Sequence, residues 1–190
     1  MRVLITGGSG TIGRSFIKNY TDYFDIFSLS RDENKQTQLS RYFPSVKQYL
    51  GSVEDRETVF RVFEEIKPDI VIHTAAVKHI NLAEKQPIQT CKVNIVGSLN
   101  IIDASVRCDI PVTVAVSTDK ACSYESVYGG SKWLMERCFL EANSNRNKFS
   151  VCRFANVAHS DGSVLPFWLG EKRDGNPLKL TDPDMNRLMF

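Results

Sequence analysis

The sequence has only five cysteines among its 190 residues, and no two of them are separated by just two positions. An odd number argues against a disulfide framework, and the lack of a C-x-x-C pair argues against a zinc site. We therefore expect reduced thiols in the core and no metal. Long apolar runs are also missing, and residues 2–5 enter a strand directly after Met1, which leaves no room for a signal peptide. A cytoplasmic protein without membrane contact is expected.

Neither sign of charge dominates this chain. It carries 24 basic and 22 acidic residues, which gives a net charge of +2. A balance of this kind offers no overall attraction for nucleic acid or for an anionic membrane, so any anion must be bound locally. With 42% hydrophobic residues, the chain can bury a proper core and most simply forms an α/β domain.

The stretch that organises the chain is a glycine turn at residues 6–13, T-G-G-S-G-T-I-G. It follows the apolar run 2–5 and opens a predicted helix at 11–20, so the pattern is strand, glycine turn and helix. Such a turn lets the backbone approach a pyrophosphate, while the helix amino-terminus offers N–H groups. An ordinary glycine-rich turn is the alternative. The predicted cofactor ligands here are Gly7, Ser9, Gly10, Thr11, Ile12 and Gly13.

Strand and helix signals alternate along the rest of the chain. Strands are predicted at 25–30, 46–50, 70–76, 111–116 and 149–154, and helices at 54–66, 87–107 and 127–143. Short connections and the preference for right-handed crossovers turn this order into a Rossmann-type, doubly wound parallel sheet. We assign residues 1–155 to a dinucleotide-binding domain and 156–190 to the start of a substrate-binding lobe.

The end of the second predicted strand bears on the choice between NADP and NAD. Ser30 and Arg31 suit a 2′-phosphate through a hydroxyl donor and a guanidinium, which favours NADP. The alternative is that Asp32 binds the ribose of NAD and that the turn is otherwise solvated. Farther along, Ala75 and Ala76 follow a buried strand, and such small residues let a cofactor come close.

Tyr128 and Lys132 carry the chemistry that the sequence predicts. Four residues apart on a predicted helix, they share a face. We expect the ammonium to lower the pKa of the phenol, so that Tyr128 can accept a hydroxyl proton, and we expect Lys132 also to hold the nicotinamide ribose. Taken alone, Y-x-x-x-K is common on exposed helices. Its place after the fifth strand of a nucleotide fold favours oxidoreductase chemistry.

These residues resemble the extended short-chain dehydrogenase/reductase family, and more narrowly its UDP-N-acetylglucosamine 4,6-dehydratases, some of which also invert C5. Ser117-Thr118-Asp119-Lys120 is the most specific match, because a sugar 4-epimerase needs no second acid–base pair. The other matching stretches are the glycine turn and residues 30–33, 75–79, 94–97, 128–132, 153–157 and 181–182.

The resemblance implies a closed redox cycle on a nucleotide-diphosphate sugar with bound NADP. Tyr128 would take the C4 hydroxyl proton, Lys120 would remove the C5 hydrogen, and Asp119 would protonate the departing C6 hydroxyl. These roles require a lowered pKa for Lys120 and a raised one for Asp119. Without the family, a surface ion pair between the two residues would be the simpler interpretation.

Further roles follow from the resemblance alone. It implies that Thr118 and Asn156 contact the sugar nucleotide, that Lys78 lines the cofactor site, and that Asn94 belongs to that site by anchoring its backbone through the side-chain amide. Relatives of this kind often form homo-oligomers. His73 has no ligand-like partner in the sequence and is interpreted as structural.

The chain also departs from the family pattern. Asp161 stands where many of these dehydratases have a basic residue, and the chain stops at Phe190, where family members continue into the substrate-binding lobe. Part of the nucleotide pocket is therefore expected to be missing. Two other functions stay open: an NAD(P)-dependent sugar-nucleotide epimerase or reductase, and a non-catalytic dinucleotide-binding module.

Overall fold

The computed structural model describes residues 1–180, 182–186 and 188–189. The chain divides into two compact units, Met1–Arg153 and Phe154–Phe190.

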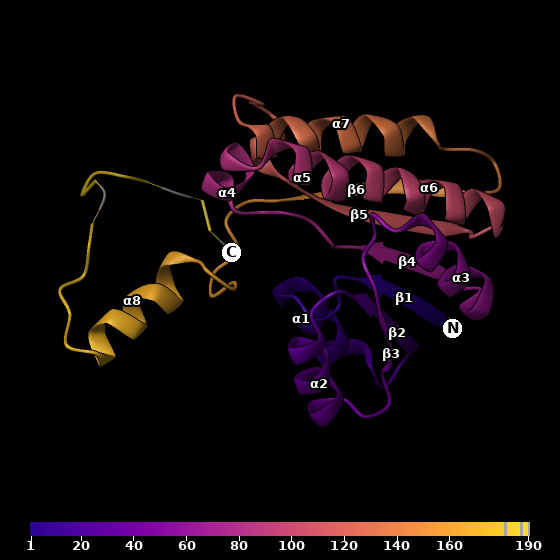
Figure 1. Cartoon of the computed structure of the whole chain (residues 1–190), viewed down its shortest axis with the longest axis horizontal. Coiled ribbons are helices and arrows are strands. Elements are labelled where there is room, and N and C mark those ends of the chain that lie inside the picture. Colours follow the sequence, from indigo (N-terminus) through magenta and orange to yellow (C-terminus); the bar gives the residue numbers. More distant parts are fainter. Residues whose placement is uncertain (181, 187, 190) are drawn as a thin grey trace. The chain divides into compact units, whose positions relative to one another are not determined.

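A six-stranded sheet forms the centre of the first unit, with the strand order β3-β2-β1-β4-β5-β6 (Figure 1). The order reverses between β1 and β4, which is the arrangement of the doubly wound dinucleotide-binding fold. Parallel registers join β1 to both neighbours, and the prediction of a Rossmann-type sheet is confirmed. The strands are β1 (Arg2–Thr6), β2 (Asp25–Ser30), β3 (Lys47–Leu50), β4 (Ile70–His73), β5 (Val112–Thr118) and β6 (Lys148–Phe154).

Helices cover both faces of this sheet, with α1 and α2 on one side and α6 and α7 on the other (Figure 1). The helices of the first unit are α1 (Thr11–Tyr20), α2 (Glu33–Tyr42), α3 (Arg56–Ile66), α4 (Ile80–Lys85), α5 (Pro87–Cys91), α6 (Gly97–Arg107) and α7 (Val127–Glu141). A π-helical turn, η1 (Lys92–Val96), joins α5 to α6, and a 3₁₀ turn, η2 (Asp119–Ala121), follows β5.

The two faces of the sheet carry separate cores because neighbouring side chains of a strand point to opposite sides. In β1, Leu4 packs into the cluster that includes α3, α6 and α7, whereas Val3 and Ile5 pack into the cluster with Ile17 of α1. All of these side chains are fully buried. The near-continuous apolar run of β1 is therefore explained by burial on both faces.

The second unit has one helix, α8 (Val164–Arg173), in the described part of the chain. Within this unit, the Trp168 indole donates to the Lys179 carbonyl at 3.1 Å, and the Asn156 amide side chain donates to the Leu188 carbonyl at 2.9 Å. Among the described residues of α8, none is buried within this chain.

Several elements differ from the sequence prediction. Helix α2 was not predicted, and it begins at Glu33 because Asp32 accepts a hydrogen bond from the Lys35 amide at 3.0 Å and caps the helix. Helices α4 and α8 were not predicted. The expectation of core cysteines is wrong for three of the five: all the thiols are free, but Cys91, Cys122 and Cys152 are exposed, whereas the half-buried Cys108 and Cys138 pack against the larger core.

Phe139 offers a direct test of the larger core. Its ring is fully buried in α7, stacked 6.0 Å from His73 and edge-on to Phe149 at 5.7 Å. We expect Phe139→Ala to lower the free energy of unfolding by about 3–5 kcal/mol, measured by urea denaturation. The neighbouring Leu140, 52% exposed, is the control, and Leu140→Ala should change it by about 0.5 kcal/mol or less. Equal losses in the two variants would contradict this assignment of the core.

Candidate active site

The glycine turn after β1 is closely packed on all sides. Gly7 has a φ of +75°, and a side chain there would meet the Thr74 hydroxyl and the Ala75 amide at 2.8 and 2.9 Å. The Gly7 amide donates to the Leu29 carbonyl at 2.8 Å, which fixes the turn to β2. At Gly13 a Cβ would lie only 2.5 Å from Gly8 Cα, so helix α1 starts in direct contact with the turn. Only glycine fits these positions.

The amino-terminus of α1 opens at this turn. Gly10 is its N-cap and has no side chain to cap the helix, and its first turn contains no acidic residue. Thr11, Ile12 and Gly13 therefore present the positive end of the helix dipole, which favours a bound anion such as a phosphate. Ser9 is buried beside them, and its amide donates to the Ser30 hydroxyl at 3.3 Å.

Strand β2 ends next to this turn with Ser30 and Arg31. The Ser30 side chain is buried and its carbonyl accepts a hydrogen bond from Gln36, which also donates to the Tyr49 carbonyl at 3.0 Å. Arg31 is exposed. Asp32, the alternative ribose ligand, caps α2 through one carboxylate oxygen, Oδ1.

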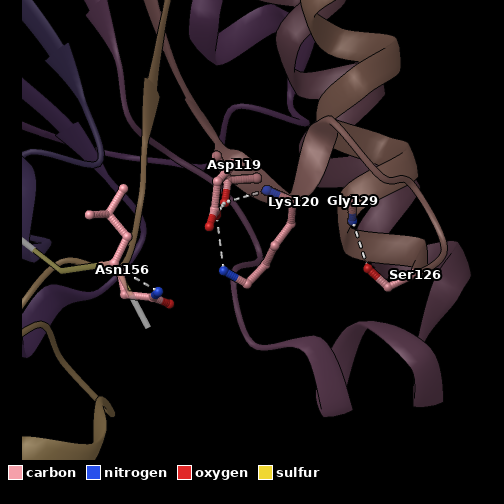
Figure 2. Close-up of polar contacts among 7 residues, drawn as sticks. Asp119, Lys120, Ser126, Gly129 and Asn156 are labelled. Carbon is pink, nitrogen blue, oxygen red and sulfur yellow. Dashed lines mark hydrogen bonds and ion pairs between the residues drawn. The ribbon is translucent and has the colours of Figure 1, made fainter. Parts of the chain in front are cut away.

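The end of β5 brings together the predicted Thr118, Asp119 and Lys120. Asp119 Oδ1 accepts from the Thr118 hydroxyl at 2.9 Å and from Lys120 Nζ at 3.1 Å (Figure 2). Partial burial raises the pKa of Asp119, but the hydrogen bonds from Lys120 and Thr118 outweigh it, so the pKa lies below its usual value. The raised pKa expected for a general acid is therefore wrong for this state, in which the pair is ionised.

Tyr128, in the first turn of α7, faces the same group of residues. Its phenol is largely buried, with a hydrogen bond to Thr118 and the Asp119 carboxylate nearby. Burial raises the pKa of Tyr128, the Asp119 charge adds to it, and the Thr118 hydrogen bond opposes it. The lowered pKa expected from Lys132 is not found, because desolvation of the phenol is the largest effect.

Lys132, one turn farther along α7, is buried with 3% of its surface exposed. Among the described residues, the hydrogen-bond partner of its Nζ is the weak acceptor Met135 Sδ, at 3.3 Å. An ammonium group has three donors, so at least two lack a good acceptor. Burial lowers the pKa of Lys132 to about 8, and the Glu136 carboxylate opposes this change.

Glu136 and Arg153 were not singled out in the sequence. Glu136 lies one turn beyond Lys132, and its carboxylate receives two hydrogen bonds from the Arg153 guanidinium of β6, at 2.8 and 2.5 Å. The Glu136 carboxylate supplies negative charge near the buried Lys132, and Arg153 holds that carboxylate in place. The spacing of Tyr128, Lys132 and Glu136, four residues each, is the signal that could have revealed Glu136.

Asn94 lies in the π-helical turn and is 1% exposed. Its side chain accepts from the Val77 amide at 2.8 Å and donates to the Val77 carbonyl and the Ser131 hydroxyl, both at 3.0 Å. Ser131 in turn donates to the Tyr128 carbonyl at 2.8 Å. This is the geometry of an anchor for the backbone of the site, as expected, rather than of a direct cofactor ligand.

His73 extends this buried network to the glycine turn. The Ser98 hydroxyl donates to the Asn94 carbonyl at 2.7 Å, so it can only accept from His73 Nε2, 3.0 Å away. The proton therefore belongs on Nε2, and Nδ1 accepts from the Thr6 hydroxyl at 2.7 Å. Burial, with the charge of Lys132 in addition, lowers the pKa of His73 to about 3 and keeps the ring neutral.

The remaining predicted residues are placed as follows. Ala75 and Ala76 are half-buried in the loop after β4, and Lys78 is exposed beyond them. Asn156 belongs to the second unit, where it pairs with Leu188, and its contact with substrate stays a prediction. Thr181 and Arg187 lie outside the described residues.

The described residues contain neither a candidate metal site nor a candidate membrane-spanning helix. No group of three or more histidine, cysteine or acidic side chains there is arranged to hold a metal ion. Within the same residues, every helix is too short or too polar to cross a bilayer.

The residues present fit a dinucleotide. The tight glycine turn lets the backbone come close to a bound phosphate, and the start of α1 favours an anion. Lys132 has N–H donors that lack good acceptors among the described residues. A buried polar group normally has its hydrogen-bond partners. Hydroxyl oxygens of a bound ribose would supply the hydrogen-bond acceptors that the Lys132 ammonium group lacks.

Comparison with known proteins gives a consistent match. Residues 3–190 match the family described as "Polysaccharide biosynthesis protein". The UDP-N-acetylglucosamine 4,6-dehydratase (inverting) of Campylobacter jejuni is 36% identical over 195 residues, which cover 97% of this chain and 58% of that enzyme. The UDP-glucose 4-epimerase of Rickettsia canadensis is 31% identical, covering 99% of this chain and 58% of that protein.

A solved structure, Pen from Bacillus thuringiensis, is 32% identical with a TM-score of 0.93. The alignment covers 100% of this chain and 62% of that one. The chain thus spans 58% to 62% of the length of these three proteins.

The buried ammonium of Lys132 generates a prediction on stability. Its pKa falls from 10.5 to about 8 on folding, so between these values the unfolded chain binds more protons and stability rises with pH. We expect Lys132→Met to be more stable than the wild type near neutral pH, and this advantage to shrink by about 3 kcal/mol towards pH 10.5.

Urea denaturation at a series of pH values measures the difference. Lys92→Met, which changes an exposed lysine, is the control and should give the wild-type pH dependence. Parallel curves for the wild type and Lys132→Met would contradict the burial of a charged Lys132.

Proposed function

The chain belongs to the polysaccharide biosynthesis protein family, and we propose that it acts as a nucleotide-sugar 4,6-dehydratase on a UDP-N-acetylglucosamine-like substrate, with bound NADP. The observation that carries this proposal is the meeting of Tyr128 with the Asp119–Lys120 pair at the end of β5. Tyr128 alone would suffice for oxidation at one carbon. An acid and a base beside it are what an elimination at the next carbons requires.

Tyr128 and Lys132 would act at C4 of the sugar. To accept a hydroxyl proton, Tyr128 must first lose its own proton and become a phenolate, and because the phenol is partly buried, a nearby cation is needed to stabilise that charge. Lys132 lies one turn away on the same helix, and the acceptor of its Nζ among the described residues is the weak Met135 Sδ. A nicotinamide cofactor bound along the glycine turn would supply the hydride chemistry. Lys132 would donate to its ribose and keep positive charge close to the phenol.

Asp119 and Lys120 would carry out the elimination of water. As an ion pair they have the wrong protonation for an acid and a base, but one proton moved across 3.1 Å converts them into a carboxylic acid and a neutral amine. Exclusion of water by a bound sugar favours this neutral form, because desolvation disfavours charged groups. The Lys120 amine could then take the C5 proton while Asp119 protonates the departing C6 hydroxyl.

The similarity of named relatives supports the substrate class. A UDP-N-acetylglucosamine 4,6-dehydratase and a UDP-glucose 4-epimerase both match nearly the whole of this chain. An epimerase or reductase is therefore the second candidate, favoured by the Tyr128–Lys132 pair that both reactions share. A dinucleotide-binding module without catalysis is the third, since the glycine turn and the start of α1 suit a dinucleotide whether or not a reaction follows.

The first test is incubation of the purified protein with UDP-N-acetylglucosamine and NADP in deuterated water. We expect loss of one water and deuterium at C5, measured by mass spectrometry and proton NMR, and the C5 configuration will show whether it is inverted. A C4 epimer formed without loss of water would favour the epimerase. Unchanged, unlabelled sugar with NADP still bound would favour the binding module.

Variants of the pair separate the two half-reactions in the same assay. Asp119→Asn and Lys120→Met should keep the oxidation at C4, seen as the absorbance of reduced nicotinamide, and slow the loss of water by about 10²- to 10⁴-fold. Glu125→Gln, an exposed acid in the loop before α7, is the control. Full water loss in both variants would contradict the roles assigned to the pair.

Arg31 generates a prediction on the cofactor. It is exposed at the end of β2, and the neighbouring Asp32 is engaged as a helix cap. A charge-assisted contact of a guanidinium with a 2′-phosphate contributes about 1.5–3 kcal/mol. We therefore expect Arg31→Met to weaken NADP binding by about 10- to 100-fold and to leave NAD binding unchanged, measured by calorimetric titration.

Arg41→Met, at the far end of α2, serves as the control for lost surface charge. If the wild type binds NAD more tightly than NADP, the assignment of Arg31 fails and Asp32 becomes the better candidate for the ribose contact.

A further inference from the structure

Helix α7 touches the turn that carries Asp119 and Lys120 at one closely packed point. A Cβ built on Gly129 would lie 2.6 Å from the Lys120 carbonyl oxygen and 3.2 Å from the Ser126 hydroxyl. Gly129 is buried, and its amide donates to the Ser126 hydroxyl at 3.0 Å, which caps the helix (Figure 2). The helix can approach the turn this closely only because residue 129 has no side chain.

Both sides of this contact carry residues of the proposed reaction. Tyr128 precedes Gly129 on the helix, and Asp119 and Lys120 lie on the turn. The Tyr128 phenol is hydrogen-bonded to Thr118, and Asp119 is near enough to affect its pKa. The contact between Gly129 and the Lys120 carbonyl therefore sets one distance in the site. It is the distance from Tyr128, proposed to act at C4, to the Asp119–Lys120 pair, proposed to act at C5 and C6.

We infer that Gly129 is a positioning residue that holds the Asp119–Lys120 pair at the correct distance from Tyr128, an inference that rests on the proposed dehydratase function. A methyl group at this position must displace either the helix or the turn. Helix α7 has 15 residues with one face in the core, whereas η2 has three residues and leads into the exposed residues 122–125. The turn is the smaller element, so it moves.

This displacement should affect one half-reaction much more than the other. Tyr128 and Lys132 stay with the helix, so oxidation at C4 is retained. Asp119 and Lys120 move with the turn, so removal of the C5 proton and loss of water become slow. Misplacement of a catalytic group by about 1 Å can cost about 100-fold in rate.

Gly130 provides a matched control within the same helix. A Cβ at this position would have one neighbour, the Tyr124 carbonyl oxygen, at 4.0 Å, which is ordinary contact. Gly129→Ala and Gly130→Ala both replace a helical glycine by the best helix former, so both gain the same intrinsic helix propensity. Any difference between the two variants therefore reports the contact with Lys120.

The experiment measures two steps in both variants with UDP-N-acetylglucosamine and NADP in deuterated water. For Gly129→Ala we expect C4 oxidation, followed by nicotinamide absorbance in a single turnover, within about threefold of the wild type, and C5 deuterium exchange slower by about 100-fold. Gly130→Ala should match the wild type in both steps. Equal slowing of both steps in Gly129→Ala, or none in either, would overturn the positioning role.

A second measurement does not depend on activity. Backbone amide NMR should show shifts centred on residues 119–122 in Gly129→Ala and not in Gly130→Ala. If the wild type does not dehydrate the sugar but these shifts appear, the contact is real and the proposed function fails. If the wild type is active and the shifts are absent, the inference about Gly129 fails and the proposed function stands.

Discussion

The buried imidazole of His73 links most of the elements around the candidate site. It accepts from Thr6 at the end of β1 and donates to Ser98 of α6, which leads through Asn94 to Ser131 of α7. A buried polar network is stabilising only when each member has its hydrogen-bond partners. Here the direction of each hydrogen bond fixes the direction of the next one, from Asn94 through Ser98 and His73 to Thr6. The glycine turn and the helix that carries Tyr128 and Lys132 are thereby held in one fixed arrangement.

The sequence was a good guide wherever a local pattern had a single physical solution. The residue limits of α1 and β2 were predicted as the structure has them, because a glycine turn or an apolar run marks each end. Helix α2 was missed because its residues are polar and its start depends on a capping Asp32 that also suits a turn. The long helix predicted at 87–107 contains a π-helical turn at Lys92–Val96, which periodicity cannot reveal.

The ionisation of the site could be predicted much less well. Residue spacing indicated that Tyr128, Lys132 and the Asp119–Lys120 pair belong together, and the end of β5 does bring Thr118 to both Asp119 and Tyr128. The directions of the pKa changes depend on burial and on which charge lies closest in three dimensions. Asp119 has its own ion-pair partner, and the Tyr128 phenol is desolvated, so both pKa values moved opposite to the expectation.

The regular spacing of Tyr128, Lys132 and Glu136 along α7 has a consequence for how this protein can change during evolution. An α-helix turns by about 100° per residue, so one inserted or deleted residue between them would carry a group to another face of the helix. The turn after β5 and the glycine turn lie outside α7 and would not follow. Substitutions on the exposed side of α7 are therefore tolerable, whereas changes of length within it would abolish the site at once, and lineages should differ in length only beyond its ends.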